Sequence, residues 1–563
     1  MMQDCQVTSF QALCTALQHP ALTADPQTVC CLLQTCRSWR AAVQQAAAGT
    51  TVIDLRSLHS IAKLSQFAAW IPRHAGMLAE VSLTLPQTED DGLSTQHYAT
   101  AAEQIILLAL QNVAAAAASA AAGSSGTPAA VPQLLRLQVF CTDFLSGAGL
   151  LAFLPAATLT KLSVKYMGGY PSANSPAISQ ALAGLTSLKE LSLQHYYAEP
   201  IRLSGRCLQA VSQLSCLSAL CIGWVAEDAD LSLLPQQLQQ LELMVVCGKQ
   251  ALQLQHLTGV RNLKLELRGA PAPHSSLPQH VALLTISTWG DEDTDELEDP
   301  TALWQQHNLQ HLGLGSLRQL VRLQVINGLA EPQMLHRVAC LPRLEQVLLC
   351  YSHSSLAARA APAWQHLPQL KGIDIEGSTS AMLDRSETEE MMQYIGAATT
   401  LTSLRLASGV MLDYYPICQH LRGLQQLREL ELSHAEGPSL QRDALNLTAL
   451  TGLTQLVLAG ATGVNDTCAV AIASWLRQLR HLELRSCGLV SAAALPAIGS
   501  LTQLRTLVLD GHAEAELEDE DILLLSSLTQ LQAIGAHETF SDEAVEAFVH
   551  DLHIAQAAEA PPE

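Results

Sequence analysis

The sequence has few aromatic and few basic residues for its length. Aromatic residues make up 4% of its 563 residues, and 30 lysines and arginines stand against 52 aspartates and glutamates, a formal net charge of −22. Phosphate neutralisation requires basic clusters, so this composition argues against nucleic-acid binding. The alanine run from Ala114 to Ala122 is too weakly apolar, and its flanks too polar, to span a bilayer. We predict neither nucleic acid nor a membrane as partner.

The sequence also lacks the short motifs that indicate common catalytic chemistry. There is no Gly-x-Ser-x-Gly elbow, no Gly-x-x-x-x-Gly-Lys phosphate loop, no dinucleotide glycine fingerprint and no Cys-x-x-Cys pair. Asp291, Asp293 and Asp295 alternate as in a calcium loop, but Glu296 replaces the required glycine and Ala302 the bidentate glutamate. We therefore predict a solvated acidic loop here, no catalytic residue, no metal, no cofactor and no enzymatic activity.

Cysteine usage and the start of the chain give no sign of export. The 15 cysteines are odd in number and scattered, and the opening MMQDCQVTSF has no charged segment followed by an apolar one. We expect reduced thiols and a cytoplasmic protein.

A leucine pattern with a nearly constant period dominates the second half of the sequence. The motif Leu-x-x-Leu-x-Leu starts at Leu427, Leu453 and Leu479, which are 26 residues apart. Further copies begin upstream and downstream, about 17 in all, at Leu78, Leu134, Leu159, Leu188, Leu217, Leu238, Val260, Val281, Leu320, Leu344, Leu370, Leu401, Leu504 and Leu531. A fixed period of this length indicates a stacked repeat.

The spacing within each copy explains why the copies must stack. The last two leucines are two residues apart, so on a strand they point to the same face. One short strand cannot bury that face alone, whereas stacked copies form a parallel sheet over a continuous core. The segments between strands, such as the one from Asp466, have helical composition, and Asp466 is the expected N-cap.

These motifs resemble the leucine-rich repeat family. The resemblance implies an α/β solenoid, a horseshoe with parallel strands on its concave side and helices on its convex side. The asparagine or cysteine that the family places after the strand is mostly missing. Cys487 occupies this position in one copy, whereas Ala461 and His512 occupy it in the neighbouring copies. Regular side-chain ladders are therefore not expected.

The N-terminal region resembles the second half of an F-box. Its apolar helix continues into Cys36-Arg37-Ser38-Trp39-Arg40. The resemblance implies that an Skp1-type adaptor would contact Leu32, Leu33, Cys36 and Trp39. A cap that shields the first repeat is an alternative that can coexist with adaptor binding.

The predicted organisation follows from these motifs. It comprises an F-box-like cap (1–50), first repeats (51–84), an Ala-rich insertion read as a flexible surface excursion (85–133), leucine-rich repeats (134–540), a C-terminal capping helix (541–556) and a disordered tail (557–563).

Two sets of residues are candidates for partner binding. The first lies beside the strand leucines and should face the concave side: Arg136, Lys161, Lys165, Asp374, Glu376, Glu429, Glu431, Glu483 and Asp510. The second set follows the strands as a possible aromatic rim: Phe140, Tyr166, Tyr196, Tyr197, Trp224 and Trp289. Rigid charge with aromatic anchors suits a protein partner. Ordinary solvated strand residues, and aromatic packing on the next loop, remain alternatives.

Two functions fit the sequence. The F-box resemblance implies a substrate-recognition subunit of an SCF-type ubiquitin ligase. The alternative is a structural or regulatory repeat scaffold without a ligase, for example in a cytoskeletal or ciliary (axonemal) assembly, which would place the protein there or in the nucleus.

Overall fold

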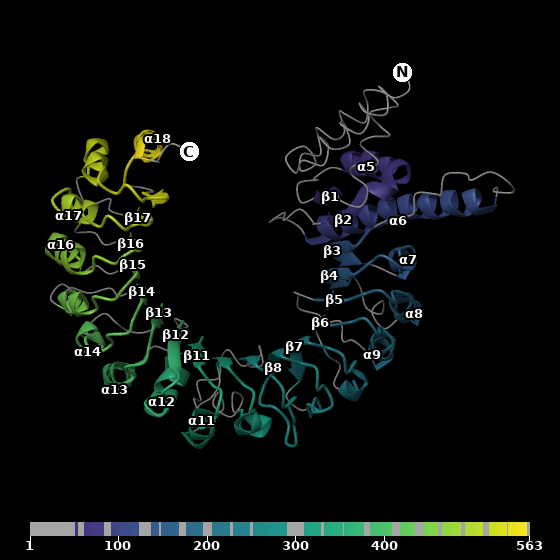
Figure 1. Ribbon diagram of the computed structural model, residues 1–563, viewed down its shortest axis with the longest axis horizontal. Helices are drawn as coiled ribbons and strands as arrows, with labels where there is room; N and C mark the ends of the chain where they lie inside the picture. Colours follow the sequence, from purple (N-terminus) through teal and green to yellow (C-terminus); the bar gives the residue numbers. More distant parts are fainter. Residues whose placement is uncertain are drawn as a thin grey trace, which may run out of the picture. The chain divides into compact units, whose positions relative to one another are not determined.

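The computed structural model describes most of the chain after residue 50 (Figure 1). The described residues are 51–54, 61–83, 92–122, 137–145, 148–167, 176–194, 205–223, 225, 229–247, 251–289, 309–327, 332–352, 354–376, 383–407, 417–433, 443–459, 464–485, 490–510, 517–536 and 539–559.

The chain divides into two compact units. Unit 1 comprises residues 1–266 with 276–278, and unit 2 comprises residues 267–275 with 279–563. In each unit, most strands are followed along the chain by a helix or a short helical turn, whereas β7, β8 and β9 follow one another without a described helix between them (Figure 1).

Unit 1 contains the N-terminal strands. Each pairs in parallel with the next along the chain, from β1 through β7. The strands are β1 (Thr51–Asp54), β2 (Leu78–Leu83), β3 (Val139–Leu145), β4 (Lys161–Met167), β5 (Glu190–Leu193), β6 (Ala219–Ile222) and β7 (Gln240–Cys247); β8 (Asn262–Arg268) spans the boundary of the units. The helices are α5 (Ile61–His74), η1 (Ala75–Met77), α6 (Gly92–Ala122), α7 (Ala148–Ala152), α8 (Pro176–Gly184), α9 (Gly205–Ser212) and η3 (Leu231–Leu233).

Unit 2 repeats the same plan. Its strands pair in parallel and in chain order from β9 to β18. They are β9 (Leu283–Trp289), β10 (Arg322–Ile326), β11 (Gln346–Tyr351), β12 (Leu370–Ile375), β13 (Ser403–Leu406), β14 (Glu429–Ser433), β15 (Gln455–Ala459), β16 (His481–Arg485), β17 (Thr506–Asp510) and β18 (Ala533–Gly535). The helices are η5 (Gln310–Leu312), η6 (Leu314–Ser316), α11 (Pro332–Ala339), α12 (Ser354–Trp364), α13 (Arg385–Ala397), α14 (Cys418–Leu421), η7 (Ala444–Ala449), α16 (Asp466–Trp475), α17 (Leu495–Gly499), η8 (Asp519–Leu525) and α18 (Asp542–Glu559).

The repeating leucines occupy the same register position in neighbouring strands. Leu430 lies opposite Leu404 on one side and Leu456 on the other, and each of the three is at most 1% exposed. Each such leucine contributes about 1.5–3 kcal/mol by leaving water. The leucines therefore make every copy depend on its neighbours, and both units are parallel α/β repeat solenoids.

Backbone hydrogen bonds repeat with the same period. The carbonyl of Thr402 accepts from the N–H groups of Arg428 (2.8 Å) and Glu429 (3.1 Å) in the next copy. The carbonyl of Arg428 in turn accepts from Thr454 (2.8 Å) and Gln455 (3.0 Å). Each strand therefore begins where the preceding copy supplies an acceptor, which fixes the register of the side chains described below.

The copy predicted to begin at Leu134 begins instead at Leu137. In β3, Phe140 lies opposite Leu162 of β4, and Thr142 lies opposite Val164. Phe140 is 2% exposed and Thr142 is 6% exposed, so both occupy core positions. The prediction was wrong by three residues because phenylalanine and threonine stand where other copies carry leucine or valine.

Part of the segment predicted as a flexible surface excursion is the long helix α6. This helix packs against α5 and buries Ile106, Ala109 and Leu110. The expectation of a wholly flexible excursion was wrong because these apolar residues give the alanine-rich helix a face that packs on its neighbour.

A bulge shifts the pairing between β11 and β12. The register changes between Val347 and Leu348, and beyond it Cys350 lies opposite Asp374. Tyr351 follows Val347 and Leu349 in the regular alternation of β11 and lies in the core, where it is 2% exposed and its hydroxyl accepts a hydrogen bond from Trp364 Nε1 (3.3 Å). The bulge thus places Asp374 in its row on the sheet.

Polar caps on the helical side also connect neighbouring copies. Asn465, rather than the predicted Asp466, caps α16 by accepting from Cys468 N (3.0 Å). The carboxylate of Asp466 instead accepts from the N–H (2.7 Å) and the hydroxyl (2.6 Å) of Ser491 in the next copy.

The C-terminal capping helix predicted at 541–556 corresponds to the last helix, α18. Phe548 and Leu552 on it are 4% and 6% exposed, and it contacts η8 of the preceding copy. Within the described part of the chain, no helix combines the length and apolar character needed to cross a membrane.

Candidate functional site

We call the surface formed by those side chains of β10–β18 that point away from the buried core the strand face of unit 2. One row of side chains crosses this face from strand to strand. Register places these residues side by side in consecutive strands: Cys350, Asp374, Arg405, Glu431, Val457, Glu483 and Val508. Neighbouring strands are about 4.8 Å apart, so charged side chains in adjacent positions interact directly.

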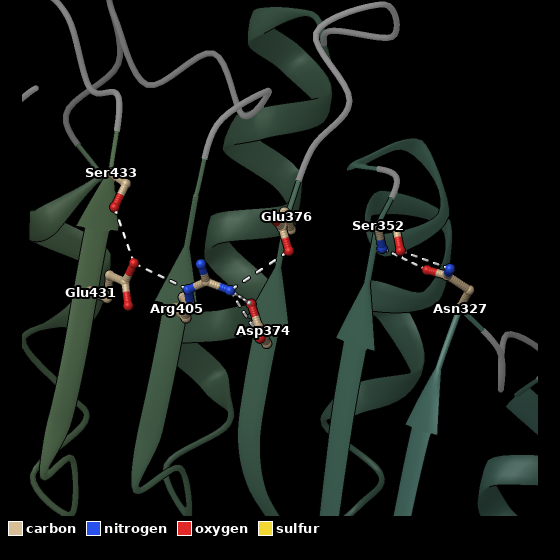
Figure 2. A network of polar contacts seen from close by, with 7 residues as sticks. All are labelled: Asn327, Ser352, Asp374, Glu376, Arg405, Glu431 and Ser433. Atoms are coloured by element: carbon tan, nitrogen blue, oxygen red, sulfur yellow. Dashed lines mark hydrogen bonds and ion pairs between the residues drawn. The ribbon is translucent and has the colours of Figure 1, made fainter. Parts of the chain in front are cut away.

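Arg405 lies at the centre of three carboxylates in this row and beside it. Its Nε is 3.1 Å from Glu431 Oε1, and its Nη1 is 3.5 Å from Asp374 Oδ2 and 3.7 Å from Glu376 Oε2. Figure 2 shows the guanidinium between β12 and β14, reached by carboxylates from both sides. We call these four residues the Arg405 cluster.

The alternation of core and surface residues along each strand explains why these charged side chains point to the strand face. Asp374 lies between the buried Ile373 and Ile375, and Arg405 lies between the buried Leu404 and Leu406. Because side chains alternate along a strand, a residue between two core positions must point to the strand face. Three successive copies therefore deliver an acid, a base and an acid in line.

The cluster keeps an excess of negative charge. Its three carboxylates and one guanidinium carry a formal −2, and Glu429, exposed at the start of the same strand as Glu431, adds a further negative charge to this part of the strand face. Burial raises the pKa of the Asp374 carboxyl above its ordinary value, although Arg405 opposes that change. The hydrogen bond to Glu431 raises the pKa of the Arg405 guanidinium, so this group stays charged.

A hydrogen-bonded bridge lies beside the cluster, at the ends of β10 and β11 (Figure 2). Asn327, at φ 58°, donates through Nδ2 to Ser352 Oγ (2.8 Å) and accepts through Oδ1 from Ser352 N (2.5 Å). The Thr288 hydroxyl donates to the Asn327 carbonyl (2.7 Å). This is a local side-chain ladder after a strand, and it holds β9, β10 and β11 together next to the acidic surface.

A second charged group lies on β16. Glu483 is 13% exposed and sits between His481 Nε2, at 2.6 Å, and Arg485 Nη2, at 2.7 Å. Val457, which is 7% exposed, separates this group from the Arg405 cluster along the row. The predicted acid Glu483 is therefore already paired within the chain.

The predicted lysines of unit 1 lie on its strand face and are exposed. Lys161 Nζ is 2.9 Å from Glu190 Oε2, and the hydrogen bond to Glu190 raises the pKa of that lysine. Four strands along, on β8, Lys264 Nζ contacts Glu242 (2.5 Å) and Glu266 (3.1 Å). Burial lowers the pKa of Lys264, but these hydrogen bonds outweigh it and raise the pKa to about 12. A glutamate thus pairs with Lys161, one of the three cations predicted for the early copies.

The aromatic rim is supported at none of the positions that the structure describes. Phe140 belongs to the core at 2% exposure, so its prediction as a partner contact was wrong. The remaining predicted positions on the rim, at the adaptor contact and on the concave face are not described, either as whole residues or in their side chains. They are Leu32, Leu33, Cys36, Trp39, Arg136, Tyr166, Tyr196, Tyr197, Trp224, Trp289 and Asp510.

The sequence reasoning missed the cation at the centre of the site. Arg405 occupies the same between-leucine position as Glu431 and was detectable from that spacing. His481 and Arg485 flank Glu483 at two-residue spacing and were detectable in the same way. Among the described residues, no group of three or more His, Cys, Asp or Glu side chains could hold a metal ion.

Comparison with known proteins gives a match in structure and none in sequence. No known family matches the sequence, and no curated protein matches it. Among solved structures, the chain is similar to the crystal structure of the yeast Rad7 and Elc1 complex. That match covers 43% of this chain and 72% of the other at 16% identity, with a TM-score of 0.31.

Proposed function

We propose that this chain is a leucine-rich-repeat scaffold, a horseshoe in form, that binds a positively charged protein partner on the strand face of unit 2 and catalyses no reaction itself. The observation that carries this proposal is the Arg405 cluster. It holds an excess of carboxylates on a sheet face that, in the described chain, no helix covers.

The acceptors of the Arg405 cluster are preorganised. Glu431 is held by Arg405 and also accepts from the Ser433 hydroxyl (3.2 Å), so its carboxylate is oriented before any partner arrives. Groups fixed in advance lose less conformational entropy on binding, which favours affinity. A lysine or arginine of the partner would therefore meet acceptors already in position.

The strand face of unit 2 combines charged and apolar surface. Val508 is partly exposed in the same row as Glu431, and Leu348 lies against Gly372 one row away. Complementary charge sets orientation and association rate, whereas apolar contacts supply much of the affinity. The strand face offers both within a few strands.

The test is charge reversal at the two most accessible acids. Glu376→Lys with Glu429→Lys should weaken the partner retained by the wild-type chain by about 1–2 kcal/mol, on the order of 5- to 30-fold in Kd at low salt. The matched control, Glu390→Lys with Glu546→Lys, reverses two exposed charges on helices α13 and α18 and should leave the Kd unchanged. Equal binding by both double variants would remove the strand face as the binding surface.

We further propose that this scaffold serves as the substrate-recognition subunit of an SCF-type ubiquitin ligase. The support is the sequence run Cys36–Arg40 and its F-box resemblance. The full-length chain should retain a purified Skp1-type adaptor, and Trp39→Ala should abolish this. The control Trp475→Ala, at a tryptophan 62% exposed on α16, should not. No retention by the wild-type chain would favour the scaffold without a ligase.

A further inference from the structure

A basic cavity of about 620 Å³ lies on the helical side of unit 2, away from the strand face. It is formed by η5, η6, the turn before β10 and helix α11. His311, Arg318 and Arg337 line it, and none of its described lining residues is acidic. In a chain with a net charge of −22, a polar cavity whose described lining is cationic or neutral is a marked departure from the composition.

Two glycines shape the floor of this cavity. Gly313 adopts φ 60°, a left-handed conformation that costs glycine little, and the Ser316 hydroxyl closes the turn by donating to its carbonyl (2.8 Å). A side chain at Gly315 would begin 2.9 Å from Arg337 Cβ and 3.6 Å from its Cδ. The bare backbone of Gly315 therefore lets the stem of Arg337 lie along the floor, which directs this arginine along one wall of the cavity.

The two arginines have no internal counter-ion in the described chain. Arg405, Arg485, Lys161 and Lys264 each have a carboxylate within 4 Å, whereas neither Arg318 nor Arg337 forms an ion pair with any described residue. Both are exposed at the cavity. No described carboxylate therefore competes with an external anion for these two guanidinium groups.

We propose that this cavity binds a phosphate monoester, with the guanidinium groups of Arg318 and Arg337 holding the phosphate oxygens. A planar guanidinium donates paired hydrogen bonds that match phosphate, and two arginines that line the same cavity bind a doubly charged phosphate more tightly than they bind a singly charged carboxylate. The volume lies within the range of small-ligand sites, about 300–1,000 Å³, and far exceeds one phosphate ion. The partly apolar floor, with Met334 and Leu314, would contact the organic part of the ester.

The experiment uses the full-length chain and calorimetry at low salt with three probes: inorganic phosphate, glucose 6-phosphate and a phosphoserine peptide. At least one ester should bind at least about tenfold more tightly than inorganic phosphate, and the tighter of the two esters identifies the source of the group. Arg318→Gln and Arg337→Gln should each weaken that binding by about tenfold or more, the effect of one lost charge-assisted contact.

The control is Arg422→Gln, an exposed arginine after α14 in the same unit, which should bind as the wild type does. Both cavity variants should melt at the wild-type temperature because the substituted side chains are exposed. Absence of ester binding, equal affinity for ester and inorganic phosphate, or equal binding by wild type and both cavity variants would each overturn the proposal. None of these results bears on the strand face.

Discussion

Replacing Arg405 with glutamine should destabilise the strands around it. The substitution removes contacts at 3.1, 3.5 and 3.7 Å to Glu431, Asp374 and Glu376, whose side chains are 27%, 36% and 66% exposed. Solvent-accessible pairs contribute about 0.2–1 kcal/mol each, so the three together amount to about 1–2 kcal/mol. Repulsion among the remaining carboxylates adds to the loss.

The loss should depend on pH in a defined direction. Burial already raises the folded-state pKa of Asp374, and Arg405 is the main group that lowers it. Without Arg405 that pKa rises further, so the folded state binds its proton more tightly than the unfolded state does. The added penalty is absent at pH values below the unfolded pKa of about 3.9 and is complete above the raised folded pKa. The variant should therefore lose more stability near neutral pH than in mild acid.

Hydrogen exchange is the suitable assay because a repeat array need not unfold in one step. The opening free energy of amides in β13 and β14 should fall by about 1–2 kcal/mol. The control Glu429→Gln removes a neighbouring charge without removing a contact to Arg405, and should leave these amides unchanged or slightly more protected. A loss of opening free energy below about 0.3 kcal/mol, or a loss that is the same near neutral pH and in mild acid, would refute the reasoning.

Three further predictions concern the contacts between copies. Asp443→Ala should cost about 2–4 kcal/mol, because this buried carboxylate accepts from two backbone N–H groups of the preceding copy, at 2.6 and 3.0 Å; a urea midpoint equal to wild type would contradict this. Gly396→Ala places a Cβ 2.5 Å from a backbone carbonyl and should lower the melting temperature, whereas Gly423→Ala, with its nearest atom at 3.8 Å, should not; equal melting of the two variants would argue against close packing there. Burial raises the pKa of Cys207 to about 12, so iodoacetamide should label exposed Cys216 far sooner in the native protein, as read by mass spectrometry; comparable rates would contradict the burial.

Much of the strand arrangement was predictable because leucine spacing determines it. Leu430 and its partners in adjacent strands sit where the 26-residue period places them. The pattern failed at β3, where Phe140 takes the place of a leucine. It also could not reveal the bulge between β11 and β12, because the pairing of two strands is not visible in the spacing within one strand. Local spacing identifies core positions only while the core residues keep their usual chemistry.

The candidate site was only half predictable. Alternation along a strand placed Asp374 and Glu431 on the strand face. Whether these carboxylates form ion pairs depends on the residue opposite them in the neighbouring strand, which is Arg405. Arg405 is 31 residues from Asp374 in sequence and adjacent in register, so its influence requires the pairing as well as the pattern. The basic cavity was less accessible still, because Arg318 and Arg337 are brought together by a turn and a helix.

Carboxyl footprinting of the full-length chain with its bound partner tests the central claim most directly. Glu376 and Glu429 are exposed in the free chain and should become protected from carbodiimide labelling when the partner binds, while Glu390 and Glu546 on the helices remain reactive. Protection of Glu390 and Glu546 with unchanged labelling of Glu376 and Glu429 would contradict a partner on the strand face of unit 2.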